Sequence, residues 1–212
     1  ASGMSTGGSF VQTGRSATDA VKYTGSAGAD TFIMSRTADV INGGAGTNDT
    51  LTIAKAAILG GLNVDLSAAD EQILSFNGSA TSGTVTGFEN VDASGYTGSF
   101  GAQITAIKTG STITGTANAD QITGGAGNDT INVTSTAASA SDVMDGGAGT
   151  GDTINIVATT DFADTDGNIV NIETVTIGAG AVNVDLTGQT EAFTITGGTG
   201  DNVIVGGSGA DA

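Results

Sequence analysis

The stretch GTANADQIT-GGAGNDTIN (residues 115–132) places two copies of a nine-residue pattern back to back. The pattern is G-G-x-G-x-D-x-U-x, where U is a large apolar residue, and the second copy matches at every defined position. Glycines permit the positive φ angles of a tight turn, and such a turn directs carbonyl oxygens inward. Asp120 and Asp129 add hard anionic oxygens, and D-x-U-x is a short strand whose U residue points into a core. The pattern therefore predicts turns that ligate a hard cation such as calcium.

The same register recurs along the chain beyond this pair. Most further copies keep an aspartate at the sixth position, and one carries an asparagine, which retains an oxygen ligand but lacks its charge. The residues at that position are Asp30, Asp39, Asp142, Asn202 and Asp211. The apolar U positions are occupied by Phe32, Ile41, Leu51, Ile122, Ile131, Met144, Ile154 and Ile204. So many copies in phase predict the stacked turns of a solenoid.

Two copies depart from the pattern in the same way. GGAGTNDTL (43–51) and GGAGTGDTI (146–154) each carry one extra residue before their aspartates, Asp49 and Asp152. The added residue moves the carboxylate relative to the turn carbonyls. We therefore expect these two ligands to be less secure than those of the regular copies.

A longer quasi-repeat overlies the nine-residue copies. TITGTANADQITGG (112–125) is similar to TITGGTGDNVIVGG (194–207), and GFENVD (87–92) is similar to NIETVT (171–176). Each block begins with nine-residue copies, continues through plain strands and returns to nine-residue copies. This arrangement favours similar stacked rungs over an exact duplication of a domain.

The repeats predict one continuous domain. Residues 1–22 are expected to be an N-terminal extension or a leading rung, and residues 23–212 a single calcium-binding β-solenoid. Within it, the two quasi-repeated blocks cover about 23–111 and 112–205. The chain stops inside a further copy that begins at Gly206, so we expect it to be a fragment of a longer protein.

Between the nine-residue copies, the chain is predicted to form plain strands. Apolar and polar residues alternate at strand period in six segments: 62–66, 88–92, 102–107, 172–177, 182–186 and 193–196. Two other stretches, Ala54–Leu59 and Ser67–Leu74, are interpreted as short helical turns on the outside, with Ser67 as an N-cap.

Composition agrees with a narrow solenoid. The 212 residues include 36 Gly and no Pro, Cys, Trp or His, and aromatic residues make up only 4%, so a broad aromatic core is excluded. Acidic residues number 22 against 5 basic ones, and the net charge of −17 opposes compaction until cations neutralise it. This charge argues against nucleic acid or an anionic membrane as a partner. We find neither a stretch apolar enough for membrane insertion nor a signal peptide.

Three segments carry a family resemblance. Residues 25–53, 112–156 and 194–211 resemble RTX (hemolysin-type) calcium-binding repeats, and the Thr-, Ala-, Gly- and Ser-rich strands between them resemble bacterial surface-layer (S-layer) proteins and large repeat adhesins. The resemblance implies an all-β fold, a right-handed parallel β-roll or β-helix solenoid with several Ca²⁺ ions in its turns. It also implies type I secretion, with folding outside the cell on meeting calcium.

The resemblance further implies which residues hold calcium. In the family, sixth-position aspartates and turn carbonyls of stacked turns share each ion. Carried over, the metal ligands are Asp30, Asp39, Asp120, Asp129, Asp142 and Asp211, with Asp49, Asp152 and Asn202 as altered ligands.

Four other aspartates leave two interpretations open. Asp145 precedes a double glycine and is either a further ligand or a turn residue. Asp161, Asp164 and Asp166 in DFADTDGN either hold an extra ion or form a solvated turn. They lack the spacing and the terminal glutamate of an EF-hand loop, so the solvated turn is favoured.

The remaining acidic residues considered lie on predicted strands or at their starts. Asp65, Asp92 and Asp185 lie on strands and are expected to face solvent. Glu89 and Glu173 occupy matching places in the two blocks and either cap a turn or ligate a cation. The structural role is favoured for both.

The sequence gives little support for catalysis, so the chain is not expected to be an enzyme. It has no His or Cys, no serine in a G-x-S-x-G context and no P-loop, and its carboxylates are explained by calcium turns. An ice-binding or ligand-binding face would need regular Thr-x-Thr ranks, and the pairs Thr112/Thr114 and Thr194/Thr196 are too few.

We therefore expect a calcium-dependent extracellular structural protein at the cell surface. It would be a segment of an S-layer lattice or an adhesin that self-associates and contacts cell-envelope polysaccharide. The alternative is an RTX β-roll that serves as the export and folding module of a secreted enzyme or toxin.

Overall fold

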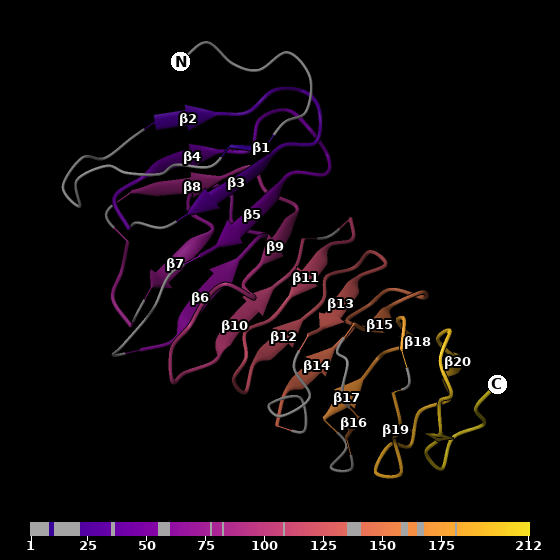
Figure 1. Cartoon of the computed structure of the whole chain (residues 1–212). Helices are drawn as coiled ribbons and strands as arrows, with labels where there is room; N and C mark the ends of the chain where they lie inside the picture. The colour runs from indigo at the N-terminus through magenta and orange to yellow at the C-terminus, as the bar shows by residue number, and fades with distance from the viewer. Residues whose placement is uncertain are drawn as a thin grey trace.

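Every regular element of the described chain is a β-strand (Figure 1). The computed structural model describes residues 9–10, 22–34, 37–54, 60–76, 78–81, 83–107, 109–134, 141–157, 161–164, 168–180 and 182–212. Over these residues the strands are short, two to four residues each, and no helix forms. Sixteen of the seventeen strand pairings are parallel, so the predicted all-β parallel solenoid is confirmed.

Nine strands stack in parallel to form the longest sheet. In order, they are β1 (Ser9–Phe10), β3 (Thr31–Met34), β5 (Thr50–Ile53), β9 (Asn90–Asp92), β11 (Thr112–Thr114), β13 (Thr130–Val133), β15 (Thr153–Ile156), β18 (Thr174–Ile177) and β20 (Thr194–Thr196). In Figure 1 this sheet descends from the N-terminal to the C-terminal end of the molecule. Because β9 pairs with β11, hydrogen bonding is continuous from one quasi-repeated block to the next.

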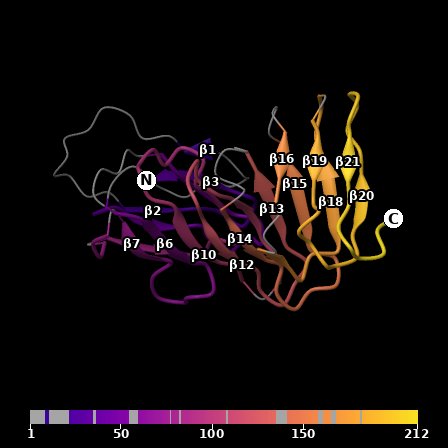
Figure 2. The same ribbon diagram turned by 90° about the horizontal axis from the view of Figure 1, so that it is seen from below.

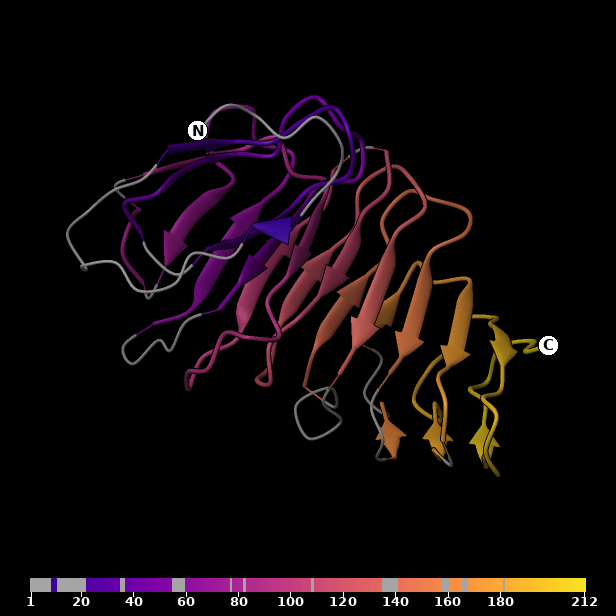
Figure 3. The same ribbon diagram turned by 45° about the horizontal axis from the view of Figure 1, so that its top comes forward.

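Three shorter sheets form the other sides of the solenoid. The six-stranded sheet contains β17 (Ile169–Val170), β14 (Val143–Asp145), β12 (Gln121–Thr123), β10 (Ala102–Thr105), β6 (Leu62–Asp65) and β7 (Ile73–Phe76). One three-stranded sheet contains β16 (Phe162–Ala163), β19 (Val184–Asp185) and β21 (Ile204–Val205). The other contains β2 (Lys22–Thr24), β4 (Val40–Asn42) and β8 (Thr84–Thr86). Strands follow one another along a single axis in Figures 2 and 3.

The inward side chains of the nine-stranded sheet form continuous columns. Ile113 is in register with Ile131, and Ile131 with Ile154, and each is 1% exposed or less. Their β-branched side chains have few rotamers, so identical residues stack well from rung to rung. Seven of the eight predicted U residues are buried, while Ile204 on β21 is 38% exposed. The nine-residue spacing therefore located the core.

The side chains of the same sheet that alternate with the core form two ranks of mostly hydroxyl and amide groups, all at least partly exposed except Asn90, which is buried. From β3 to β20, the first rank is Thr31, Thr50, Asn90, Thr112, Thr130, Thr153, Thr174 and Thr194. The second is Ile33, Thr52, Asp92, Thr114, Asn132, Asn155, Thr176 and Thr196. Parallel register aligns the two predicted Thr-x-Thr pairs with two more, on β5 and β18, but the other four strands interrupt the second rank with Ile, Asp or Asn. The face therefore lacks the regular Thr-x-Thr ranks of an ice-binding surface, as expected.

All six segments with strand period contain a strand, although each strand is shorter than predicted. These strands are β6, β9, β10, β18, β19 and β20. In three of the segments an aspartate at the strand end accepts the N–H two residues later, which turns the chain. The pairs are Asp65–Ser67, Asp92–Ser94 and Asp185–Thr187, each at 3.0 Å. The three carboxylates are half-exposed, as expected for strand aspartates that face solvent.

The helical turn predicted for residues 67–74 is wrong. The chain turns at residues 66–67 and enters β7, which runs antiparallel to β6 and covers its edge. Ser67 caps no helix, because its N–H and its hydroxyl both donate to Asp65 Oδ1. Ile73 and Phe76 become buried, so tertiary packing overrides the helical period. Of the other predicted helical turn, all but Ala54 lies outside the described residues.

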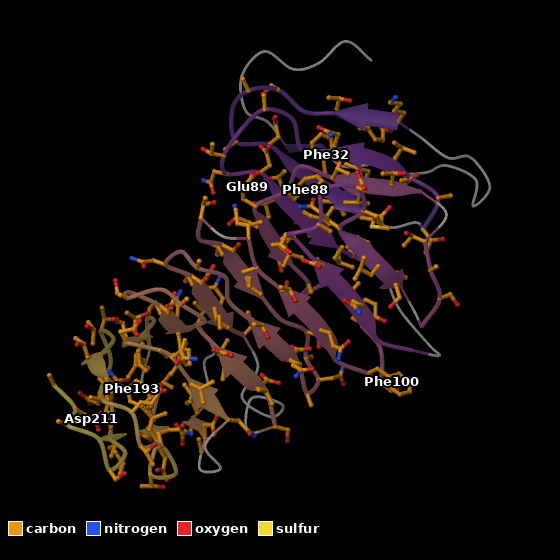
Figure 4. All side chains as sticks on the ribbon, turned by 180° about the vertical axis from the view of Figure 1, so that it is seen from behind. Phe32, Phe88, Glu89, Phe100, Phe193 and Asp211 are labelled. Carbon is orange, nitrogen blue, oxygen red and sulfur yellow. The ribbon has the colours of Figure 1, made fainter. Side chains whose placement is uncertain are left out.

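Turns along two edges of the solenoid carry the acidic residues. Residues just before the strands of the nine-stranded sheet lie on one edge, and residues just before the strands of the six-stranded sheet lie on the other. Glu89, which precedes β9, and Phe100, close to the start of β10, lie on opposite edges in Figure 4.

Candidate metal centres

Carboxylates stack in the turns that precede strands of the nine-stranded sheet. Two trios occupy this place, namely Asp30, Asp49 and Glu89 before β3, β5 and β9, and Asp129, Asp152 and Glu173 before β13, β15 and β18. In each trio, the carboxylate of one rung accepts the backbone N–H of the acidic residue in the preceding rung. The four donor–acceptor pairs are Asp30 N–Asp49 Oδ1 (2.8 Å), Asp49 N–Glu89 Oε2 (2.8 Å), Asp129 N–Asp152 Oδ1 (2.7 Å) and Asp152 N–Glu173 Oε2 (2.8 Å). Negative charges therefore repeat at the spacing of the rungs.

The second edge carries a shorter ladder of the same kind. Asp120 and Asp142 precede β12 and β14 in the six-stranded sheet. Asp120 Oδ1 accepts the N–H of Ala102 at 2.6 Å, and Asp142 Oδ1 accepts the N–H of Asp120 at 2.7 Å. The regular nine-residue copies thus place alternate aspartates on alternate edges.

In the nine-residue turns, the protein itself satisfies the second carboxylate oxygen. That oxygen accepts the N–H of the residue four positions earlier, at the second position of the repeat. The pairs are Ser26 N–Asp30 Oδ2 (2.6 Å), Thr116 N–Asp120 Oδ2 (2.6 Å) and Gly125 N–Asp129 Oδ2 (2.9 Å). Asp120 and Asp129 also accept the N–H of Ala102 and Ser111, so each of these two bridges its own turn and the turn one rung earlier.

The ten-residue turns leave one carboxylate oxygen open. Asp49 and Asp152 are 0% exposed, yet Oδ2 of each has no hydrogen-bond partner. The extra residue places these aspartates five positions after the second glycine of the turn, Gly44 or Gly147, instead of four. A buried carboxylate oxygen without a donor is unfavourable unless a cation binds it.

A turn carbonyl lies beside each open oxygen. The point at which a Cβ on Gly149 would stand lies 2.5 Å from the Gly127 carbonyl oxygen and 2.6 Å from each carboxylate oxygen of Asp152. The corresponding point at Gly46 lies 2.8 Å from the Gly28 oxygen and 2.9 and 3.0 Å from those of Asp49. Calcium takes oxygen ligands at about 2.3–2.6 Å. The carbonyl and both carboxylate oxygens thus converge on the side of the turn where glycine has no Cβ. A cation bound by these oxygens would supply positive charge and cross-link two rungs.

Burial raises the pKa of five aspartates in the two ladders. This is the largest effect on Asp49, Asp120, Asp129 and Asp152, and it outweighs the backbone N–H groups that favour the charged form. Burial raises the pKa of Asp142 to about 7, and the charges of Asp120 and Asp164 add to the shift. The fold thus holds negative charges close together in poorly solvated turns, an arrangement that favours a bound cation.

The other predicted ligands lie in separate turns. Asp39 is buried before β4. Asp211 is half-buried and accepts the N–H of Phe193 at 2.9 Å, while Asn202 accepts that of Val182 at 2.9 Å. Asp145 is half-buried at the end of β14. Its Oδ1 accepts hydrogen bonds from Gly147 N and Asn171 Nδ2, which supports its interpretation as a turn residue.

The aspartates after Val157 differ in their surroundings. Asp161 is exposed and accepts two hydrogen bonds from Asn183, at 2.9 and 3.1 Å. Asp164 is 0% exposed and accepts a hydrogen bond from Gln189 Nε2 at 3.0 Å, so the solvated turn predicted here is wrong for this residue. Asp166 lies outside the described residues. Phe162 and Asp164 alternate inward on the strand, which explains the burial.

The two glutamates are the third members of the two ladders. Glu89 and Glu173 were expected mainly to cap turns, and each accepts the backbone N–H of a turn aspartate, Asp49 or Asp152, as that role requires. The signal that identifies them is an acidic residue directly before an alternating strand. Glu191, which the sequence did not single out, accepts the N–H groups of Asn171 (2.7 Å) and Ile172 (3.2 Å).

Together, the fold and the turns define a parallel β-solenoid with cation-binding edges. Within the described ranges no three acidic side chains converge on one point, so backbone carbonyls are needed to complete each site. Three segments, 24–51, 110–134 and 194–212, match the family model of the RTX calcium-binding nonapeptide repeat (4 copies). The chain therefore carries RTX calcium-binding repeats in these three segments, and RTX repeat proteins are typically secreted.

Comparison with other known proteins adds nothing to this family match. No curated protein and no solved structure matches the chain. In the described part of the chain, no helix is long and apolar enough to cross a membrane.

Proposed function

We propose that this chain is a segment of a calcium-dependent extracellular structural protein, part of an S-layer lattice or of a cell-surface adhesin. The observation that carries the proposal is the outer face of the nine-stranded sheet. Of the sixteen side chains in its two ranks, only Asp92 is charged, although the chain has a net charge of −17. Acidic residues are thus concentrated elsewhere, and this face is left neutral.

Hydrogen bonds hold the second rank in a fixed arrangement. Asn132 Nδ2 donates to Thr114 Oγ1 at 3.1 Å, Asn155 Nδ2 to Asn132 Oδ1 at 2.9 Å, and Thr176 Oγ1 to Asn155 Oδ1 at 3.1 Å. An ordered polar face loses little conformational entropy when it packs against another surface. Such a face suits a second copy of the chain or a neutral cell-envelope polysaccharide.

The contact between neutral faces is expected to form only when calcium is bound. Without bound cations, the acidic turns repel those of a second copy. Bound calcium neutralises the turns and fixes the rungs, so that the neutral faces can approach. The chain leaves the cell by type I secretion, folds where calcium is abundant and has no catalytic activity of its own.

Electron microscopy of the full-length protein across a calcium titration tests this proposal. We expect sheets or higher oligomers at millimolar calcium and dispersed molecules after chelation. Thr130→Glu combined with Thr153→Glu adds two charges to the neutral face and should abolish assembly. Thr105→Glu combined with Thr123→Glu is the matched control, since these threonines pair in the same way on the six-stranded sheet.

Two outcomes would contradict the proposal that the protein assembles into a lattice. The first is dispersed monomers at millimolar calcium with a folded solenoid, and the second is equal assembly of both double variants. The first outcome favours the alternative function, an RTX export and folding module of a secreted enzyme or toxin.

A further inference from the structure

We propose that Glu89 and Glu173 are cation ligands, each forming with the aspartate one rung earlier a two-carboxylate site outside the nine-residue pattern. The two sites pair Asp49 with Glu89 and Asp152 with Glu173. They join the ten-residue turn of each ladder to the plain rung that follows. The inference rests on the calcium-binding turns and is independent of lattice formation.

The first site lies between β5 and β9. Glu89 Oε2 accepts the N–H of Asp49 at 2.8 Å, so its carboxylate is held against the turn that contains the open Oδ2. Asp49 is 0% exposed, and the Gly28 carbonyl lies beside its carboxylate at the space above Gly46. Burial raises the pKa of Glu89, and the charge of Asp49 raises it further. Two carboxylates and a carbonyl are therefore close together in a turn where negative charge is poorly solvated.

The second site repeats this arrangement between β15 and β18. Glu173 Oε2 accepts the N–H of Asp152 at 2.8 Å, and Asp152 is 0% exposed with its Oδ2 open. The Gly127 carbonyl lies beside this carboxylate above Gly149. The charge of Glu173 contributes to the raised pKa of Asp152, after burial.

The recurrence does not follow from a copied stretch of sequence. Asp49 and Glu89 are 40 residues apart, whereas Asp152 and Glu173 are 21 apart. In both cases, however, the two residues directly precede strands that are neighbours in the nine-stranded sheet. In both cases the two acidic residues therefore lie at the same edge of adjacent rungs. A set of ligands that spans two rungs requires this position.

Acceptance of a backbone N–H does not by itself indicate a ligand. Glu191 also accepts backbone N–H groups, from Asn171 and Ile172, but those donors are not buried aspartates with an open oxygen. Glu89 and Glu173 differ from it by facing Asp49 and Asp152. Glu191 therefore serves as a matched control for a purely structural glutamate.

The test replaces charge while keeping hydrogen bonding. In Glu89→Gln combined with Glu173→Gln, the amide oxygen still accepts the aspartate N–H, but one negative charge is lost at each site. Isothermal titration of the calcium-free chain with Ca²⁺ should show two sites weakened on the order of tenfold or lost, because calcium affinity depends on the number of charged ligands. Glu191→Gln should bind calcium as the unmodified chain does.

A spectroscopic readout keeps the proposal testable if the double variant folds poorly. The chain contains only four glutamates, Glu71, Glu89, Glu173 and Glu191, so ¹³C-labelled glutamate gives a simple carboxylate infrared band. We expect calcium to shift part of this band in the unmodified chain and in Glu191→Gln. Unchanged calcium affinity in the double variant, or no calcium-dependent shift in the unmodified chain, would overturn the proposal.

Discussion

A single added residue separates the two kinds of acidic turn in this chain. With a separation of four positions from the second repeat position to the aspartate, as from Gly125 to Asp129, a backbone N–H satisfies the second carboxylate oxygen. With five, as in Gly147 and Asp152, that oxygen is left open. The longer turns thus present a buried carboxylate oxygen that a cation can bind, and the glycine beside it lets a turn carbonyl approach that carboxylate.

Gly149→Ala should therefore weaken calcium-induced folding. An added Cβ would stand 2.5–2.6 Å from three oxygen atoms, closer than real Cβ contacts, so it must displace the carbonyl or the carboxylate of Asp152. Gly197→Ala is the control, because nothing lies within 3.9 Å of its added Cβ. Calcium titrations followed by circular dichroism should show a higher midpoint for the first variant only. Equal midpoints would contradict the proposed place of the ion.

The raised aspartate pKa values predict how calcium-free stability depends on pH. An aspartate in an unfolded chain has a pKa of about 4, whereas in the fold that of Asp142 is about 7. Between these values the folded chain holds a proton that the unfolded chain has released, so folding stability falls as pH rises from about 4 to about 7. In calcium-free buffer the thermal transition should be highest near pH 4, where these aspartates are protonated, and should fall and then be lost as the pH approaches neutrality.

Asp142→Asn provides the control for this pH dependence. The variant removes the titrating group, so its melting temperature should vary less with pH over the same range. A melting temperature of the unmodified chain that rises with pH in this window would contradict the assignment.

At the scale of elements, stacking decides which short segments become strands. Strands of two to four residues are too short to be stable alone, and each is stabilised by pairing with the rungs on either side. The antiparallel β6–β7 pair is the exception to parallel stacking. There the chain reverses at Asp65 and Ser67 and covers the edge of β6, an arrangement that protects an otherwise unpaired strand.

The β6–β7 pair predicts opposite outcomes for two adjacent substitutions. Ile73→Ala should lower the free energy of unfolding by about 2–5 kcal/mol, because Ile73 is 0% exposed in the core. Leu74→Ala should change it by about 0.5 kcal/mol or less, because Leu74 is 45% exposed. Denaturant unfolding in saturating calcium gives both values. Similar losses for the two variants would favour the helical turn over β7.

At the scale of the whole molecule, a thin core is combined with a large negative charge. The solenoid has a single layer of inward residues per strand and a net charge of −17. Bound ligand adds RT ln(1 + [Ca]/Kd) per site, about 2.7 kcal/mol at a hundredfold excess over Kd. Several such sites together exceed the total stability of a typical small domain, about 5–15 kcal/mol. Calcium is thus expected to decide whether the chain folds.

Chelation should unfold the acidic repeats. In excess EDTA we expect the β signal in circular dichroism to be largely lost, and calcium but not an equal ionic strength of sodium should restore it. The sodium control separates site binding from general screening of charge. A β spectrum unchanged by EDTA would show that the core alone suffices.

The sequence by itself determined the rungs, the core and most of the acidic turns. The nine-residue pattern is a local property, because its glycine turn, its aspartate and its inward apolar residue all lie within nine consecutive positions. It therefore located the buried U residues and placed Asp120 and Asp129 correctly in turns before strands. Period-two alternation likewise located the plain strands, although the turns at Asp65 and Asp185 ended two of them one residue early.

Only the tertiary structure decided which residues of different rungs meet. The partners Asp49 and Glu89 are 40 residues apart, and no local pattern gives the number of residues that the intervening rung contains. The same holds for the threonine ranks, whose members are brought into line by strand register, and for β7, where burial of Ile73 overrode a helical period. Contacts within a turn are set by neighbouring residues, but contacts between turns depend on how the whole chain winds.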